Sequence, residues 1–296
     1  MSACAPCRPA DAAPRADASA VHAALGRAAI ASLYDELALA PKPGLVSFAD
    51  AGSHGDMDAS TFLRSLFALR HYFVRIAAQG ARSTAFAPLE ALGIEAERRM
   101  LRATGGVNTH RGAIFTLGLL CAAAGAAHAA GLPRHAASLR QMLLARWGEA
   151  LEARARDPRE THGARVARAY GLRSASDEAA LGLPTLFEHV LPALREARRA
   201  GAGDQGAKLH ALFTAMAHVA DTNLVHRGGL PALRDAQRVA REFLAAGGGL
   251  GMDAPARAAR VHTIFVARRW SPGGAADLLA AACLVERLER LHGVVQ

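Results

Sequence analysis

Three glycine-containing segments carry most of the side chains in this 296-residue chain that could do chemistry. In the first, residues 41–58, two prolines fix the backbone around Lys42, and an ammonium group held in this way suits a phosphate oxygen. The same segment carries Asp50 and Asp56, whose carboxylates are the hard oxygen ligands that Mg²⁺ accepts beside substrate phosphates. An equally open interpretation is a turn that ends a helix, with its Asp and Ser side chains bound to local backbone groups.

The second segment, residues 104–112, is more specific because it combines two glycines with amide, hydroxyl and His-Arg side chains just before a predicted helix. Free N–H groups at a helix start favour an anion, and the guanidinium of Arg111 can bind phosphate through two parallel hydrogen bonds. Asn108 and Thr109 can bind a sugar hydroxyl or orient a metal-bound water. The alternative is a helix C-cap at the glycines followed by a solvated arginine. Glu97, about two turns earlier, could face the same site.

The third segment, residues 221–229, offers Asp221 as a further metal ligand and repeats the order Asn, short gap, His-Arg-Gly. This repetition, with His110 in one copy and His226 in the other, predicts two similar loops that serve one site from opposite sides. A lone histidine is more often structural than catalytic, but two in matching contexts leave both interpretations open. Asp277 is a weaker ligand candidate, since the Ser-Pro pair before it is adequately explained as a helix start.

Helices must position these segments. Hydrophobic residues make up 51% of the chain and aromatics only 5%, a composition dominated by Ala that suits close-packed helices. We therefore predict an all-α fold, a single multi-helix domain over residues 20–296 with its site built from helix-terminal loops, after a disordered tail at 1–19. Helices are predicted at about residues 20–40, 59–78, 88–103, 112–130, 134–155, 184–200, 205–220, 230–246, 254–268 and 273–292.

The net charge of the chain and the absence of several sequence motifs limit the classes of function that fit it. The chain has 35 basic and 26 acidic residues, a formal net charge of +9, which favours phosphorylated ligands, small or nucleic acid. Four cysteines make no disulfide framework, and no signal peptide is recognisable, so we expect a cytoplasmic protein. The apolar segment 113–130 approaches the length of a membrane span, but its Ala and Gly content indicates a buried helix. Walker-type and Rossmann glycine motifs and His-Glu-x-x-His are absent from the sequence.

Taken in order, these segments resemble the triphosphoribosyl-dephospho-CoA synthase family over about residues 34–285. One departure is Ser176, where the family pattern leads us to expect an arginine. The segments that carry the resemblance are Pro41 to Ser47, Gly52 to His54 with Asp56 and Met57, Thr104 to Gly112, Asp221 to Leu224 with His226 to Gly229, and Ser271 to Asp277.

The resemblance implies an all-α enzyme that converts ATP and 3′-dephospho-CoA into 2′-(5″-triphosphoribosyl)-3′-dephospho-CoA and adenine. The product is the precursor of a prosthetic group, which a separate transferase attaches to the acyl carrier subunit of citrate lyase or malonate decarboxylase. Malonate decarboxylase is the favoured destination. The sequence does not specify the oligomeric state.

On this basis the expected site has three cations on the triphosphate, Lys42, Arg111 and Arg227, with Mg²⁺ on Asp50, Asp56 or Asp221. His110 or His226 would remove the proton of the attacking 2′-hydroxyl, and Glu97 is a third catalytic candidate. The remaining expected substrate-binding residues are Ser47, His54, Asn108, Thr109, Asn223 and Gly228.

Two other classes compete with this one. A metal-dependent helical phosphohydrolase would release phosphate or free triphosphoribose without dephospho-CoA, but an expected His-Asp dyad is missing. A basic helical nucleic-acid binder would cluster arginine on one exposed face and bind with steep salt dependence, whereas here arginine is spread along the chain and no aromatic residues interleave with it. We therefore expect neither a nucleic acid nor a membrane as partner.

Overall fold

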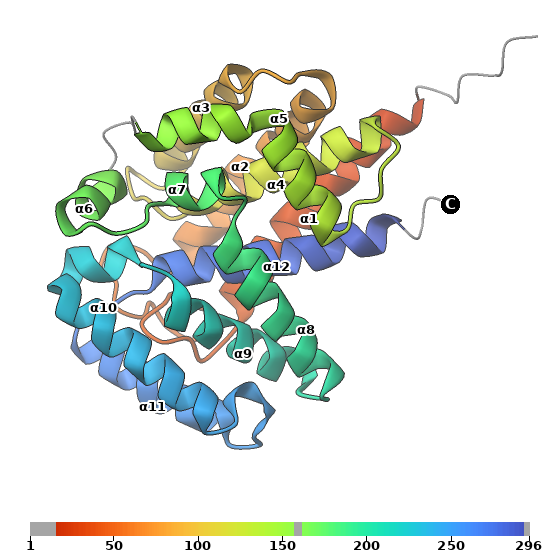
Figure 1. Ribbon diagram of the computed structural model, residues 1–296. Coiled ribbons are helices and arrows are strands. Elements are labelled where there is room, and N and C mark those ends of the chain that lie inside the picture. The colour runs from red at the N-terminus through yellow and green to blue at the C-terminus, as the bar shows by residue number, and fades with distance from the viewer. Residues whose placement is uncertain (1–15, 157–161, 293–296) are drawn as a thin grey trace, which may run out of the picture.

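A computed structural model describes residues 16–156 and 162–292, and in these ranges every regular element is helical (Figure 1). The predicted all-α fold is confirmed. The longer helices are α1 (Ala16–Ala38), α2 (Ala59–Arg82), α3 (Ala87–Ala103), α4 (Arg111–Ala129), α5 (Ala136–Arg156), α9 (Gly203–His218), α10 (Thr222–Ala245), α11 (Ala254–Ala267) and α12 (Gly273–His292). The shorter elements are α6 (His162–Tyr170), α7 (Ala175–Ala180), a π-helical turn η1 (Thr185–Val190), α8 (Leu191–Arg199) and a 3-10 turn η2 (Gly248–Leu250).

Several boundaries differ from the predictions. Helix α1 begins at Ala16, inside the predicted tail, and residues 1–15 lie outside the described residues. Helices α6 and α7 were not predicted, because six to nine residues are too few to show a clear helical period. Helix α10 begins at Thr222 rather than 230, since the chain is already helical before a kink at Gly228 and Gly229. Helix α12 spans Gly273–His292, which are the predicted bounds.

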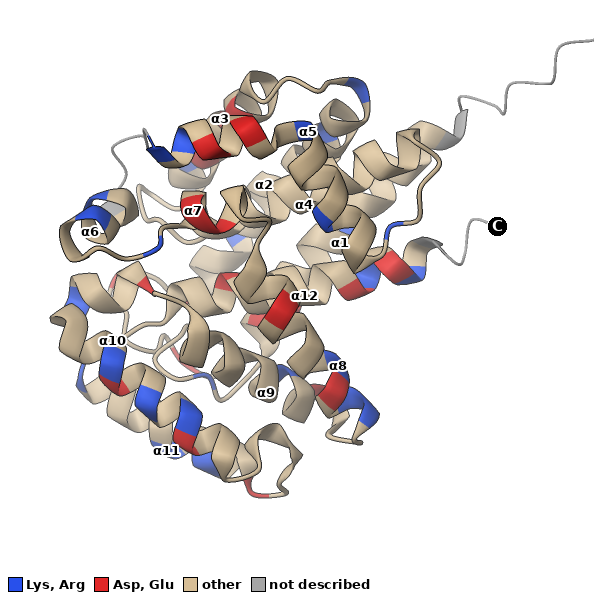
Figure 2. Cartoon of the chain, viewed as in Figure 1, with Lys and Arg blue, Asp and Glu red and all other residues tan. Residues whose placement is uncertain are grey.

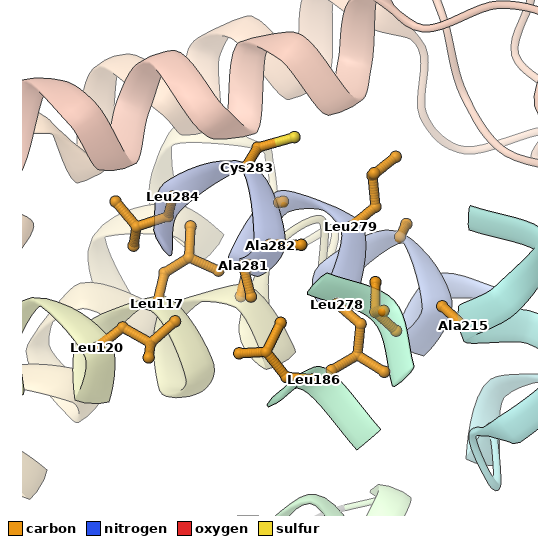
Figure 3. Close-up of a cluster of buried hydrophobic side chains, with 14 of the residues drawn as sticks. Leu117, Leu120, Leu186, Ala215, Leu278, Leu279, Ala281, Ala282, Cys283 and Leu284 are labelled. Carbon is orange, nitrogen blue, oxygen red and sulfur yellow. The ribbon is translucent and has the colours of Figure 1, made fainter. Parts of the chain in front are cut away.

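The core is built around α4 and α12, two helices made largely of small and aliphatic residues. Leu117 and Leu120 of α4 pack beside the middle of α12, which η1 and α9 cover from other sides (Figure 3). Helix α4 is long and apolar enough to cross a membrane by length and composition, but 78% of its most apolar 18-residue stretch is buried inside the protein. It is therefore the buried central helix that the sequence predicted. Charged side chains of both signs lie mainly on the outer helices (Figure 2).

Glycines let α2 and α4 approach closely. A Cβ atom placed on Gly80 of α2 would overlap the backbone carbonyl oxygen of Ala122 in α4. The converse holds at Gly125 of α4, where a Cβ would overlap the carbonyl oxygen of Ala77. These are contacts between backbones, so a side chain cannot be accommodated by a rotamer change. The position of the α4 start, where the predicted site lies, thus depends on small residues in the core.

We predict that Gly80→Ala destabilises the protein and that Gly148→Ala does not. Replacing a helical glycine by alanine normally stabilises by up to about 1 kcal/mol, but overpacking costs about 1–3 kcal/mol. Gly148 in α5 has no atom within 4 Å of an added Cβ, so only the helix gain applies there. Urea denaturation measures both free energies of unfolding. Equal stability of the two variants would contradict the close α2–α4 approach.

Candidate active site

A pocket of about 390 Å³ lies where the first turns of α4, α6, α10 and α12 meet. Backbone N–H groups at a helix start lack intrahelical partners, and each helix dipole adds a partial positive charge there. Four such ends around one cavity create a site that favours an anion. The lining residues from these turns are Arg111, Gly112, Gly163, Ala164, Thr222, Asn223, Gly273 and Gly274.

The structure brings together much of the predicted site, from segments more than 150 residues apart. The residues that line the pocket include both expected His-Arg pairs. The predicted residues found there are His54, Glu97, Asn108, Thr109, His110, Arg111, Asn223, His226 and Arg227. The predicted residues that do not line it are Lys42, Ser47, Asp50, Asp56, Asp221 and Gly228.

Arg111 and Arg227 line this pocket, and hydrogen bonds within the protein hold each guanidinium group. Arg111 donates from Nε to Glu97 at 3.1 Å, and its side chain keeps 35% of its surface exposed. Arg227 donates to the backbone carbonyls of Ser53 and Arg269 and lies 3.1 Å from Nδ1 of His54. Because these partners leave several guanidinium N–H groups uncommitted, both arginines can still bind an anion.

Two of the histidines that line the pocket, His54 and His110, are held in the neutral form. Burial, and secondly the charge of Lys42, lowers the pKa of His110 to about 3, and its Nδ1 lies 2.7 Å from the Ser65 hydroxyl. Burial, then Arg227, lowers the pKa of His54 to about 4. A neutral histidine that acts as a general base becomes positively charged when it accepts a proton, so this environment opposes the base role expected of His110. His226, at the start of α10, is exposed.

Lys42 does not face the pocket as the sequence suggested. Its ammonium is fully buried, 2.6 Å from Oε1 of Glu36 and 2.6 Å from the Glu36 carbonyl oxygen. Burial lowers the pKa of Lys42, and the Glu36 carboxylate acts in the opposite direction. It is Glu36, at the end of α1, that lines the pocket. The Lys42 ammonium therefore fixes a carboxylate that lines the pocket, while Lys42 itself does not line it.

The three predicted metal ligands are not gathered. Asp50 accepts from the backbone of Gly52 at 2.7 Å, and the Asp56 side chain is 64% exposed at the protein surface. Asp221 is the N-cap of α10, and its carboxylate accepts from the backbone N–H groups of Asn223, Gly274 and Ala275. Within residues 16–156 and 162–292 no three His, Cys, Asp or Glu side chains form a metal-binding group. Asp221 instead joins the starts of α10 and α12.

Two other predicted substrate-binding positions, Ser47 and Gly228, make contacts within the protein and do not line the pocket. Ser47 is buried and its hydroxyl accepts from the Ala49 backbone within the turn. Gly228 lies at the kink of α10 against the Trp270 ring. Ser176, the departure from the family pattern, does line the pocket, while the nearby Arg173 is bound to Glu178 at 3.0 Å.

Three pocket groups had little or no signal in the sequence. Asp277 is only a weak candidate in the sequence and Glu36 belongs to no motif, because each is one polar residue in a helix and nothing in its spacing shows which way it points. Arg154 of α5 is one of many arginines; it pairs with Glu90, and its guanidinium lies 5.4 Å from the Phe115 ring centroid. Phe62 and Phe115 add an aromatic wall.

We predict that Lys42→Met lowers the free energy of unfolding by about 3–5 kcal/mol, because Glu36 is left buried without its partner. The matched control is Arg156→Met, since Arg156 pairs at 3.1 Å with Glu152 and both side chains are more than half exposed. Loss of that pair should cost about 1 kcal/mol or less. Urea denaturation provides the comparison. A Lys42→Met protein that keeps its stability but no longer binds ATP would instead indicate that Lys42 contacts the triphosphate directly.

Comparison with known proteins identifies the family to which this chain belongs. The sequence model of the family described as ATP:dephospho-CoA triphosphoribosyl transferase matches residues 22–295. Similar proteins named probable 2-(5''-triphosphoribosyl)-3'-dephosphocoenzyme-A synthase occur in Acinetobacter calcoaceticus, 38% identical with 87% of this chain and 88% of the relative covered, and in Azotobacter vinelandii, 42% identical with 90% and 91% covered. A third, in Stutzerimonas stutzeri, is 41% identical with 88% and 90% covered. No solved structure shows a significant match. The helical pocket described above therefore belongs to a transferase, and the chain is a member of the ATP:dephospho-CoA triphosphoribosyl transferase family.

Proposed function

We propose that the chain joins the triphosphoribosyl group of ATP to the 2′-hydroxyl of 3′-dephospho-CoA and releases adenine. The observation that carries the proposal is the convergence of four helix starts and two arginines on one pocket in a member of this family. The group to be transferred carries three phosphates, and the pocket concentrates N–H dipoles and guanidinium groups of matching charge.

The triphosphate is proposed to lie between Arg111 and Arg227, which stand at the starts of α4 and α10. Their side chains come from two matching Asn, gap, His-Arg-Gly segments, which accounts for the repetition in the sequence. An adenine ring of the substrates is proposed to stack on Phe62 or Phe115, which also line the pocket.

Mg²⁺ is proposed to enter with ATP. This ion usually needs only one or two protein carboxylates beside substrate phosphates, so a pocket without a three-ligand cluster in the described residues still fits it. Glu97 is the pocket carboxylate that would hold the ion, since it lies beside Arg111 where the phosphates are proposed. When bound, Mg²⁺ would neutralise part of the phosphate charge.

The product is proposed to serve as the prosthetic-group precursor of a carrier protein. In the cytoplasm a separate transferase would attach it to the acyl carrier subunit of malonate decarboxylase, which we favour, or of citrate lyase. Labelled product offered to both carrier subunits together with their transferases distinguishes the two destinations.

We predict that purified protein incubated with ATP, Mg²⁺ and dephospho-CoA releases adenine in step with a product whose mass is the sum of the two substrates less adenine. Chromatography with mass detection follows both species. Omitting dephospho-CoA should stop adenine release. Phosphate or free triphosphoribose formed without dephospho-CoA would instead identify a nucleotide hydrolase.

We predict that Arg111→Gln raises the KM for ATP about 10- to 100-fold, the cost of one or two charge-assisted hydrogen bonds to phosphate. The matched control is Arg75→Gln, because Arg75 also pairs with a glutamate of α3, Glu95 at 2.9 Å, but lies outside the pocket. Initial rates of adenine release give both constants. An Arg111→Gln enzyme with the wild-type KM for ATP would remove Arg111 from the triphosphate site.

A further inference from the structure

The pocket contains a carboxylate that the sequence offered only as a weaker ligand candidate, Asp277 in the second turn of α12. Its carboxylate accepts a hydrogen bond from the backbone N–H of Ala113 in the first turn of α4. Gly112 lies directly against it, since a Cβ atom at that position would overlap Asp277 Oδ2. A glycine at the start of α4 thus leaves room for this carboxylate to face the cavity.

Burial and the negative charges around Asp277 disfavour the ionised form of its carboxyl group. Burial raises its pKa well above the ordinary range for an aspartate, and the negative charges of Glu36 on α1 and Asp221 at the start of α10 act in the same direction. The Ala113 N–H acts in the opposite direction. Lys42 is nearby but is engaged with Glu36. A carboxylate in such surroundings gains from taking up a proton.

Asp277 differs from the other carboxylates near the pocket in the partners that occupy its oxygens. Asp221 does not line the cavity, and three backbone N–H groups occupy its oxygens. Glu36 and Glu97 each bind a cationic side chain, Lys42 and Arg111. Asp277 faces the cavity and accepts from the Ala113 N–H, and its two carboxylate oxygens have capacity to accept further hydrogen bonds.

We propose that Asp277 is the catalytic base for the transfer, a role that rests on the proposed function. It accepts the proton of the attacking 2′-hydroxyl as the bond from that oxygen to C1 of the ATP ribose forms. The bond from C1 to the adenine nitrogen breaks, its electron pair leaves with adenine, and the adenine nitrogen takes a proton from solvent. Asp277 returns its own proton to solvent after product release. Its negative charge also stabilises the positive charge that develops on the ribose.

The two histidines suit this role less well. His110 is buried and held neutral, so it resists the proton that a base must take. His226 is exposed at the cavity, where water competes for the same proton. A buried acceptor avoids that competition.

The test compares Asp277→Asn with Glu286→Gln, which changes a carboxylate on the same helix that is also buried but lies outside the pocket. Asp277→Asn should lower kcat for adenine release by about 100-fold or more. It should leave the KM values for ATP and dephospho-CoA and the Mg²⁺ requirement within about threefold, as expected when only a transition-state interaction is lost. Glu286→Gln should keep the wild-type kcat.

Further measurements test whether the lost activity of Asp277→Asn results only from a folding defect. Asp277→Asn should unfold at a temperature no lower than wild type, because the amide removes an unfavourable buried charge. Wild-type kcat should fall as the pH is lowered through the raised pKa of Asp277, and the residual activity of Asp277→Asn should lack this decline. Gly112→Ala, whose methyl group takes the space of the Asp277 oxygen, should also lower kcat.

Three results would overturn the assignment: wild-type kcat in Asp277→Asn, a loss expressed as a raised KM for ATP or a higher Mg²⁺ requirement, or an unchanged pH profile. Each of these leaves the wild-type reaction intact and removes only Asp277 from the role of base. A wild-type protein that releases no adenine with dephospho-CoA would overturn the proposed function and this inference together.

Discussion

The convergence of helix starts on one cavity is the constraint on which the rest of the structure depends. Each helix start carries a partial positive charge of roughly half a unit, so several of them cannot meet without compensation. Two buried carboxylates provide it. Asp221 accepts from the first turns of both α10 and α12, and Asp277 accepts from the first turn of α4. These bonds fix three helix starts relative to one another and leave a pocket with both arginines at its wall.

The small residues of the core make this convergence possible. Gly80 and Gly125 bring the backbones of α2 and α4 together, and the Ala-rich middle of α12 packs beside α4 (Figure 3). Glycine also shapes the pocket itself. At Gly273 an added Cβ would lie 2.9 Å from the side-chain amide nitrogen of Asn223, so a side chain there would displace this pocket residue. The Ala and Gly content of the chain is thus a requirement of the site as well as of the fold.

The sequence predicted the fold class, most helices and the pairing of the two His-Arg segments, because apolar periodicity and loop residues report directly on helix bodies and ends. It could not predict which way a polar side chain points. Lys42 turns inward to Glu36, six residues earlier on α1, whereas Asp50 and Asp56 turn toward local partners or solvent. Arg154 and Asp277 reach the pocket through the packing of α5 and α12, which no local pattern records. Tertiary contacts decided these positions.

The central claim is that the triphosphate of ATP binds between the starts of α4 and α10. A crystal structure of the protein with Mg²⁺ and ATP, in the absence of dephospho-CoA, tests it most directly. The account predicts phosphate oxygens within hydrogen-bonding distance of the Arg111 and Arg227 guanidinium groups, with the Lys42–Glu36 pair unbroken. Phosphates bound at another surface, or a Lys42 released from Glu36 to contact them, would contradict it.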